Sequence, residues 1–153
     1  MKSPVYLEIT NGNTVYYSDR EMTKFHRTDG PAIEYSNGTK GWYLNDKRHR
    51  TDGPAIEWPG GGKEWYLDGK LHRTDGPAVE TSSGHKGWYV NGKRHRTDGP
   101  AFEGSGGAKS WYLDGKLMTE KEFVAATAPT IELTLDEIAA KFGVPAGNLK
   151  IKK

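Results

Sequence analysis

This sequence predicts an elongated all-β fold: an antiparallel meander of tandem 23-residue β-hairpin repeats, followed by a small C-terminal strand–helix–strand unit. Three observations predict it. The segment HRTDGPA recurs in steps of 23 residues and begins at His26, His49, His72 and His95. The aromatic pair Trp-Tyr recurs with the same step, at Trp42-Tyr43, Trp65-Tyr66, Trp88-Tyr89 and Trp111-Tyr112. Turn-forming residues separate short strand-like runs at the same places in every unit.

The first half of each unit has the pattern of a hairpin. In the first unit, residues 31–35 (PAIEY) form a strand-like run, and residues 36–39 (SNGT) are a turn signal because Asn-Gly tolerates positive φ. Residues 41–44 (GWYL) are expected to form the second strand. A single apolar position follows each HRTDGPA segment and is filled by Ile33, Ile56, Val79 and Phe102.

The second half of each unit begins with another turn. This turn has mostly type I′ chemistry, and it is formed by Asn45-Asp46, Asp68-Gly69, Asn91-Gly92 and Asp114-Gly115. A short run through the histidine follows, and Thr-Asp-Gly-Pro then breaks the chain before the next unit. The units should stack edge to edge, so that identical side chains line up in rows.

The N-terminal end of the array departs from the repeat. We interpret residues 1–25 as a degenerate capping copy, in which Asn11-Gly12 precedes Tyr16-Tyr17 at the offset found inside the repeats. Residues 26–117 hold the four tandem repeats. The degenerate copy is expected to close the edge of the sheet.

The C-terminal end of the array also changes. Met118 stands where the next histidine of the series is expected, and the HRTDGPA segment does not return. We interpret residues 118–129 as a second cap followed by a linker, with residues 123–129 (FVAATAP) as the linker.

The tail, residues 130–153, has the pattern of a helix between two extended segments. Thr134 lies three residues before Glu137, which is the spacing of a capping box at a helix start. The helix is expected from about Leu135 to Phe142, with Gly143 as its C-terminal stop.

On either side of this helix, residues 130–133 (TIEL) and 149–153 (LKIKK) are extended in character and are expected to pair. The segment TLDEIAAKFGVPAGNLK is similar both to the first helix and turn of a helix-turn-helix and to part of a LysM module. Neither pattern is complete here, so the two alternatives stay open.

Composition restricts the class of protein. Cysteine is absent, so disulfides and thiolate chemistry are excluded, and the chain fits a reducing compartment. No apolar run is long enough to cross a bilayer and the first residues lack a secretory h-region, so we expect a cytoplasmic protein. The net charge is only +2, and no motif indicates a cofactor.

The His-Arg-Thr-Asp tetrad is the first candidate for chemistry. A catalytic interpretation would pair His26 with Asp29 and use Thr28 as nucleophile. A metal interpretation would use the stacked histidines as ligands. We favour a structural role, because repeated copies on a thin sheet give a ladder and not one enclosed site. His85 lies outside this ladder, in a turn, and is expected to be solvated.

Three rows of side chains are candidates for binding. The first is the arginine row, in which each Arg is also expected to pair with a nearby Asp or Glu: Arg27, Arg50, Arg73 and Arg96. The second is the histidine row: His26, His49, His72 and His95. The third is the tyrosine row: Tyr43, Tyr66, Tyr89 and Tyr112.

Two further patterns concern the packing of the units. We expect the Trp row and the Ile33 position to form a continuous core flanked by the Tyr row; the alternative is that one aromatic row is left exposed for binding. Alternate units are more alike than neighbouring ones, because Gly41 and Gly87 alternate with Glu64 and Ser110, which gives a 46-residue super-period.

The unit length and the segment Asn91-Gly92-Lys93-Arg94-His95 resemble the MORN repeat family over roughly residues 26–117. The chain departs from that family where Arg-Thr-Asp-Gly-Pro-Ala follows the histidine, and its two turns are spaced more widely. The closest likeness is to divergent bacterial and phage repeats, some of which are described as antitoxins. The resemblance implies short β-hairpin repeats and a scaffold that binds proteins or lipids.

These patterns favour a non-catalytic scaffold that acts by binding a protein partner, in the manner of a phage or bacterial inhibitor or antitoxin-like protein. The alternative is a nucleotide or nucleic-acid binder, since Arg suits phosphate and Trp or Tyr suits base stacking. A homo-oligomer is left open. An enzyme is the interpretation we rank last.

Overall fold

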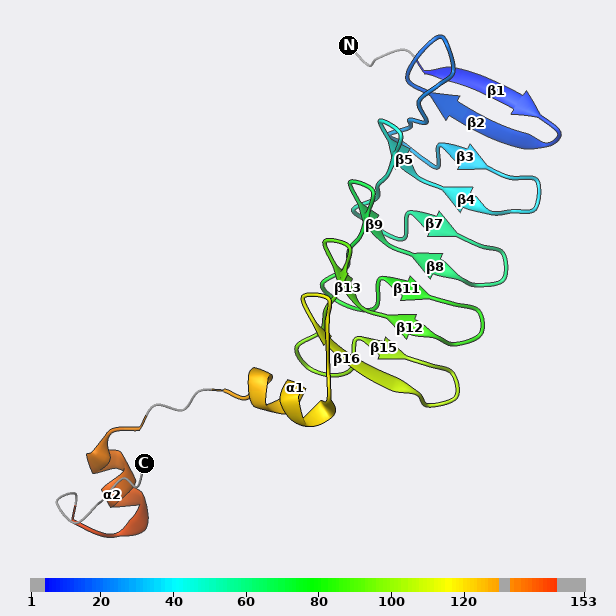
Figure 1. The fold of residues 1–153 in the computed structure, drawn as a ribbon. Helices are drawn as coiled ribbons and strands as arrows, with labels where there is room; N and C mark the ends of the chain where they lie inside the picture. Colours follow the sequence, from blue (N-terminus) through cyan, green and yellow to red (C-terminus); the bar gives the residue numbers. More distant parts are fainter. Residues whose placement is uncertain (1–4, 130–132, 146–153) are drawn as a thin grey trace.

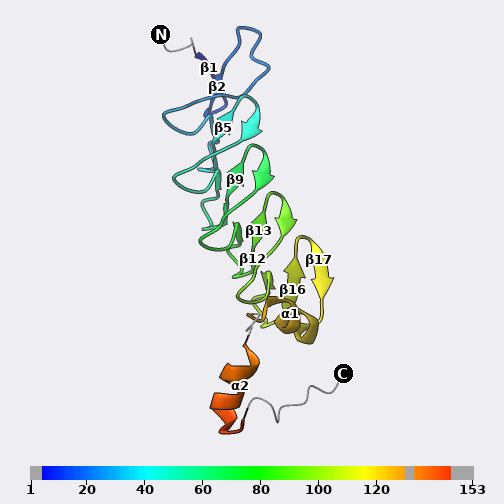
Figure 2. The same cartoon turned by 90° about the vertical axis from the view of Figure 1, so that its left-hand side faces the viewer.

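The computed structural model describes residues 5–129 and 133–145, and its main body is an array of stacked hairpins (Figure 1). An 11-stranded antiparallel sheet runs through the whole array in the order β1-β2-β3-β4-β7-β8-β11-β12-β15-β16-β17. Three separate two-stranded hairpins, β5-β6, β9-β10 and β13-β14, form a second row beside it (Figure 2). The prediction of an all-β repeat array is therefore confirmed.

The strands are short, and most of them contain two residues. The array begins with β1 (Tyr6–Thr10) and β2 (Asn13–Tyr17). The strands of the main sheet that follow are β3 (Ile33–Glu34), β4 (Lys40–Gly41), β7 (Ile56–Glu57), β8 (Lys63–Glu64), β11 (Val79–Glu80), β12 (Lys86–Gly87), β15 (Phe102–Glu103) and β16 (Lys109–Leu113). The side hairpins use β5 (Tyr43–Leu44), β6 (Lys47–Arg48), β9 (Tyr66–Leu67), β10 (Lys70–Leu71), β13 (Tyr89–Val90) and β14 (Lys93–Arg94), and β17 (Lys116–Met118) pairs with β16.

The prediction that residues 41–44 form one strand is wrong, because the chain changes sheets at Trp42. The Trp42 amide donates to the carbonyl of Ala55 in the next unit, at 2.7 Å. The Trp42 carbonyl accepts from the amide of His49 in the side hairpin, at 3.0 Å. One residue thus bonds to both rows, and it separates β4 from β5.

Both kinds of predicted turn are confirmed. In the main-sheet hairpins, Gly38 has a φ of 86° and Gly84 a φ of 87°. In the side hairpins, both central residues have positive φ, as a type I′ turn requires. Asp68 and Gly69, for example, have φ values of 51° and 82°.

The core of the array is a row of alanines. Ala32, Ala55, Ala78 and Ala101 are fully buried, and Ile33 and Ile56 are buried beside them. The expectation that the Trp row joins this core is wrong, since all four Trp rings stay half-buried. The Ala55 amide donates to the carbonyl of Glu64 at 2.8 Å and its carbonyl accepts from the amide of Trp42 at 2.7 Å, so this buried residue is joined to the backbone on both sides.

The register of the main sheet gives its two faces different chemistry. Ile33 lies opposite Gly41, which lies opposite Ile56 in the next unit, and this row continues as Glu64, Val79, Gly87, Phe102 and Ser110. The other face carries alternating Glu and Lys, beginning with Glu34, Lys40, Glu57 and Lys63. Opposite charges therefore face each other across neighbouring strands.

The N-terminal copy reproduces the repeat with Tyr16 in the place of Trp. The Tyr16 amide donates to the carbonyl of Ala32 at 2.8 Å, and its carbonyl accepts from the amide of His26 at 3.0 Å. The longer stretch before His26 forms a loop in which the Asp19 carboxylate accepts from the Thr23 amide at 2.7 Å. β1 is the outermost strand, so within the described residues this copy leaves a sheet edge open and does not close it.

At the other end, the prediction of a linker over residues 123–129 is wrong, because helix α1 (Glu120–Thr127) occupies most of it. Thr119 and Glu122 form a capping box at its start. The Phe123 side chain is buried, and the helix contacts β16 and β17. This end of the array is therefore covered by a helix, as Figure 1 shows.

In the tail, the predicted helix is confirmed as α2 (Leu135–Phe142). Its capping box uses Thr134 and Glu137, and Gly143 ends it in the left-handed conformation with a φ of 64°. The extended segments expected on either side fall largely on residues 130–132 and 146–153, outside the described part of the chain. Neither α1 nor α2 is long and apolar enough to span a membrane.

Candidate binding groove along the repeat array

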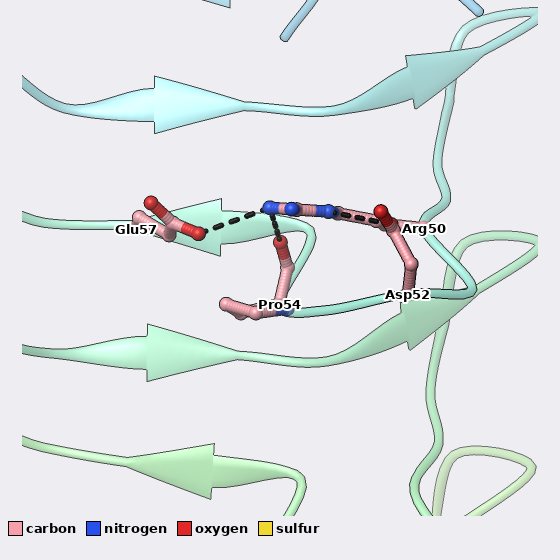
Figure 3. A network of polar contacts seen from close by, with 4 residues as sticks. All are labelled: Arg50, Asp52, Pro54 and Glu57. Carbon is pink, nitrogen blue, oxygen red and sulfur yellow. Dashed lines mark hydrogen bonds and ion pairs between the residues drawn. The ribbon is translucent and has the colours of Figure 1, made fainter. Parts of the chain in front are cut away.

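The arginine that follows each histidine is held by four kinds of contact. In the second unit, Arg50 Nε donates to Asp52 at 2.8 Å, and Nη1 donates to the carbonyl of Pro54 at 3.2 Å and to Glu57 at 3.0 Å (Figure 3). Its guanidinium also lies over the ring of Trp42, with Cζ 4.0 Å from the ring centroid. The expected pairing of these arginines with nearby carboxylates is confirmed.

The same contacts recur along the array. Each Arg pairs with the Asp two residues later and the Glu seven residues later, at Arg27, Arg73 and Arg96. Each of these guanidinium groups also lies 4.0 Å from an aromatic centroid, which belongs to Tyr16, Trp65 and Trp88 respectively. Since two carboxylates surround each guanidinium, the positive charge of the arginine row is already balanced within the protein.

The glycine of HRTDGPA makes this arrangement possible. A Cβ on Gly53 would lie 3.0 Å from Cζ of Arg50, and a Cβ on Gly76 would lie 2.9 Å from Cζ of Arg73. Each guanidinium therefore lies between an aromatic ring and glycine backbone. This close approach of the guanidinium explains why a glycine occupies the position. The sequence did not predict the contact, because arginine and glycine meet only after the turn has folded.

Pairing with arginine lowers the pKa of three of these Asp carboxylates. The hydrogen bond from Arg50 and its positive charge hold the pKa of Asp52 below the ordinary value of 3.8. Hydrogen bonding to Arg73 and Arg96 likewise lowers the pKa of Asp75 and of Asp98. These carboxylates stay largely exposed, with 70% to 80% of the side chain accessible across the four units, so they form an acidic rim.

The four ladder histidines share one environment, as predicted. Nδ1 of His26 accepts from the amide of Asn45 at 3.1 Å, and Nδ1 of His49 accepts from the amide of Asp68 at 3.3 Å. The same bond recurs at His72 and His95 with the turn residue 19 positions later. Each histidine therefore fastens the type I′ turn of the following side hairpin.

The pairing of His26 with Asp29 that a catalytic interpretation would need is not formed. His26 Nδ1 lies 3.0 Å from Oδ1 of Asn45, whereas Asp29 accepts from Arg27 at 2.8 Å. Among the described residues, no three His, Cys, Asp or Glu side chains gather in a way that could hold a metal ion.

Three equivalent hollows follow one another along this face, with volumes of about 560, 490 and 500 Å³. Two consecutive arginine turns form the walls of each hollow. Between them, the first hollow is lined by Trp42, Leu44 and His49, and the corresponding residues one and two units later line the others. Neighbouring hollows share an arginine turn, so the three hollows follow one another in a row along this face, which we call the Trp groove.

No protein-family model, no curated protein and no solved structure gives a significant match.

Of the predicted binding rows, the structure brings two into the Trp groove. All four arginines line the hollows, and so do three of the histidines and three residues of the Trp row, which was expected in the core. His26 and Trp111 line none of these three hollows. The tyrosines do not line these hollows. The Tyr43 ring instead packs near Gly41, where a Cβ would lie 2.8 Å from the ring.

The tyrosine row is hydrogen-bonded to two arginines, and the sequence did not predict this contact. Arg48 donates to the hydroxyls of Tyr43 and Tyr66, at 3.4 and 3.0 Å. Arg94 bonds the hydroxyls of Tyr89 and Tyr112 in the same way. Leucines take the equivalent positions in the other two units, so the 46-residue super-period corresponds to one Tyr–Arg–Tyr cluster for every two units.

Burial and the acceptor Glu64 raise the pKa of Tyr66 in the first of these clusters. The Tyr66 hydroxyl donates to Glu64 at 2.9 Å, and the charge of Arg48 acts in the opposite direction. Glu64 is a charged residue in the mainly apolar row of the main sheet, where the alternate units have Gly41 and Gly87.

The prediction that His85 is solvated is wrong. Its ring is half-buried and stacks on Phe102, with 6.0 Å between the ring centroids and 16° between the planes. Its Nδ1 also accepts from the amide of Ser105 at 3.2 Å. The stack forms because His85 and Phe102 come from adjacent hairpins, a neighbourhood that depends on how the units pack.

Proposed function

We propose that this protein is a non-catalytic scaffold that binds an extended segment of a partner protein along the Trp groove. One observation carries the proposal: the same hollow is repeated three times, with a Trp, an aliphatic side chain and a His in each. Repeated equal hollows suit a ligand that is itself a repeating linear chain. They do not suit one small molecule with a single set of contacts.

The spacing of the hollows favours one conformation of that chain. Each unit adds two strands to the main sheet, which gives a step of about 9.6 Å at the usual strand separation. A polyproline II helix advances about 9.3 Å in three residues. A proline-rich segment would therefore place every third residue in a hollow, and such segments dock in grooves lined by aromatic side chains.

The charges of the groove favour a neutral or basic segment. The guanidinium groups are paired inside the protein, whereas the Asp carboxylates at the rim are largely exposed, as at Asp52 and Asp75. A partner with Lys or Arg between its prolines would meet these carboxylates. The resemblance to MORN repeats and their scaffold role, including antitoxin-like inhibitors, supports the same class of function in the cytoplasm.

A direct test uses a fluorescent peptide of repeated Pro-Pro-Lys triplets and measures its binding to the full chain by fluorescence polarisation. Thr51 and Thr74 each line two of the hollows, so the double variant T51W/T74W obstructs all three. We expect this variant to bind the peptide at least about tenfold more weakly, since the introduced Trp side chains occupy the hollows that would receive the side chains of the peptide. The matched control is Gly106→Trp, because a Cβ there meets no atom within 4 Å.

A second peptide with Gly in place of Pro keeps the charge and removes the polyproline conformation. It should bind more weakly than the Pro-Pro-Lys peptide. Equal binding of both peptides, or unchanged binding to T51W/T74W, would contradict the proposal.

Nucleotide or nucleic-acid binding is a second candidate, and it rests on the Tyr–Arg–Tyr clusters. Arg48 is exposed and lies over the ring of Tyr66, at 5.0 Å from its centroid. An arginine beside aromatic rings suits the stacking of bases. This candidate predicts binding of a single-stranded oligonucleotide that weakens steeply with salt and is lost in R48A/R94A.

A further inference from the structure

The open edge of β1 differs chemically from the rest of its sheet face. Leu7 is 49% exposed and Ile9 is 69% exposed. The register places Ile9 opposite Thr14 and Thr14 opposite Glu34, so these aliphatic side chains share the face that carries Glu and Lys in the main-sheet strands from β3 to β16. Val5 precedes them with the same alternation and is 49% exposed. An aliphatic stripe therefore appears on this face at the outermost strand.

Within the described part of the chain, no strand pairs with the outer edge of β1, so its backbone offers unpaired groups at these residues. The two-residue turn Asn11-Gly12 joins β1 to β2, and Thr10 lies opposite Asn13. In such a hairpin the residues next to the turn exchange hydrogen bonds, and every second residue does the same. The amides and carbonyls of Leu7 and Ile9 consequently point away from β2, towards the open edge.

The two ends of the array are not equivalent. Helix α1 contacts β16 and β17 at the C-terminal end, whereas β1 is the last strand at the N-terminal end. A sheet with one open edge can pair with a second copy and then stop, while two open edges would continue into a fibre. The covered end therefore favours a closed dimer.

We propose that two copies of this chain pair through β1, antiparallel and about a two-fold axis that passes between their Leu7 residues. Leu7 then lies opposite Leu7 of the second copy, and Val5 lies opposite Ile9 of the second copy. The sequence of the strand is self-complementary under this operation, because its aliphatic residues are symmetrically placed about Leu7. The outward amides and carbonyls complete an antiparallel ladder, and six aliphatic side chains gather on one face.

A charge-swap experiment on the full chain tests this arrangement, because the two-fold axis places residue 7 opposite itself. Sedimentation equilibrium over a range of protein concentrations should give a dimer for the natural sequence. Leu7→Lys and Leu7→Glu should each be monomeric, since like charges would face each other. An equimolar mixture of the two variants should recover a dimer that contains one copy of each, seen by native mass spectrometry.

The matched control is Leu117→Lys, which places the same charge on an exposed leucine of β17 at the other end of the array, and it should stay dimeric. Circular dichroism and Tm should show that all variants fold. A monomeric natural sequence, or variants that remain dimeric, would overturn the proposal. So would a mixture that stays monomeric, or a Leu117→Lys variant that dissociates. Peptide binding in the Trp groove depends on other residues. Its failure would therefore leave the outcomes of this dimer experiment unchanged.

Discussion

The guanidinium of Arg50 lies 4.0 Å from the centroid of the Trp42 ring, although the two residues stand at opposite ends of a side hairpin. The hairpin folds back so that the residue after His49 returns to the point where the chain left the main sheet. The cation–π contact and two carboxylate pairs then fix the arginine in one position. These contacts of the arginine hold each side hairpin against the main sheet.

Substituting the glycine beneath this arginine should destabilise the array. In Gly53→Ala the new methyl group would lie 3.0 Å from Cζ of Arg50, so the guanidinium must leave the Trp42 ring or the backbone must move. We expect a loss of about 1–3 kcal/mol in the free energy of unfolding, measured by urea denaturation. Gly106→Ala is the control, because its Cβ would meet no atom and its cost should be small.

Acid should weaken the arginine clusters. The pKa values of Asp52, Asp75 and Asp98 are lowered in the folded protein, so their stabilisation is complete above the ordinary Asp pKa of 3.8 and is lost as pH falls through the folded values. The triple variant D52N/D75N/D98N should be less stable than the natural sequence at pH 7. The difference should shrink between about pH 4 and pH 2. Urea midpoints across this range provide the measurement, and a constant difference would contradict the assignment.

The ionisation of Tyr66 reports on the first Tyr–Arg–Tyr cluster. In Glu64→Gln the carboxylate that accepts from the Tyr66 hydroxyl is lost, so the raised pKa of Tyr66 should move down towards its ordinary value. In Arg48→Leu the nearby positive charge is lost, so the pKa of Tyr66 should move up. An ultraviolet titration of phenolate absorbance distinguishes the two directions. Equal shifts of the same sign would show that the cluster is not formed.

The sequence predicted the features that short segments determine. The type I′ turn at Asp68-Gly69 needs positive φ at two adjacent positions, and those residue types adopt it locally. Helix α2 has a capping box, an αL stop at Gly143 and an amphipathic pattern between them. These signals depend on no other unit, and both elements formed where they were expected.

Features that depend on the distance between units could not be obtained in this way. Trp42 lies where the chain passes from the main sheet to the side hairpin, because its backbone bonds to both rows, whereas the hydrophobicity of Trp suggested a place in the core. Helix α1 has the same kind of capping box as α2, at Thr119 and Glu122, but it buries little apolar surface. Its segment therefore lacked the strong amphipathic pattern that identifies a helix.

The helix that covers the last unit should matter for stability. Phe123 is buried and is the residue through which α1 packs on the array, so Phe123→Ala should cost about 3 kcal/mol in the free energy of unfolding. Val124→Ala removes an exposed side chain from the same helix and should cost less than about 0.5 kcal/mol. Thermal denaturation of both variants gives the comparison. Similar losses for the two would show that the cap does not depend on Phe123.

The alternation of Arg48 with Leu71 and of Arg94 with Leu117 has a consequence for how this chain can change in length. A duplication or deletion of 46 residues keeps one Arg for every two Tyr, whereas a change of 23 residues inside the array would place two Arg units or two Leu units side by side, so that two Arg share one Tyr or one Tyr has no Arg. Duplication of two adjacent units should therefore be tolerated more readily than duplication of a single unit. Such growth would extend the row of hollows by two at a time and leave both ends of the array unaltered.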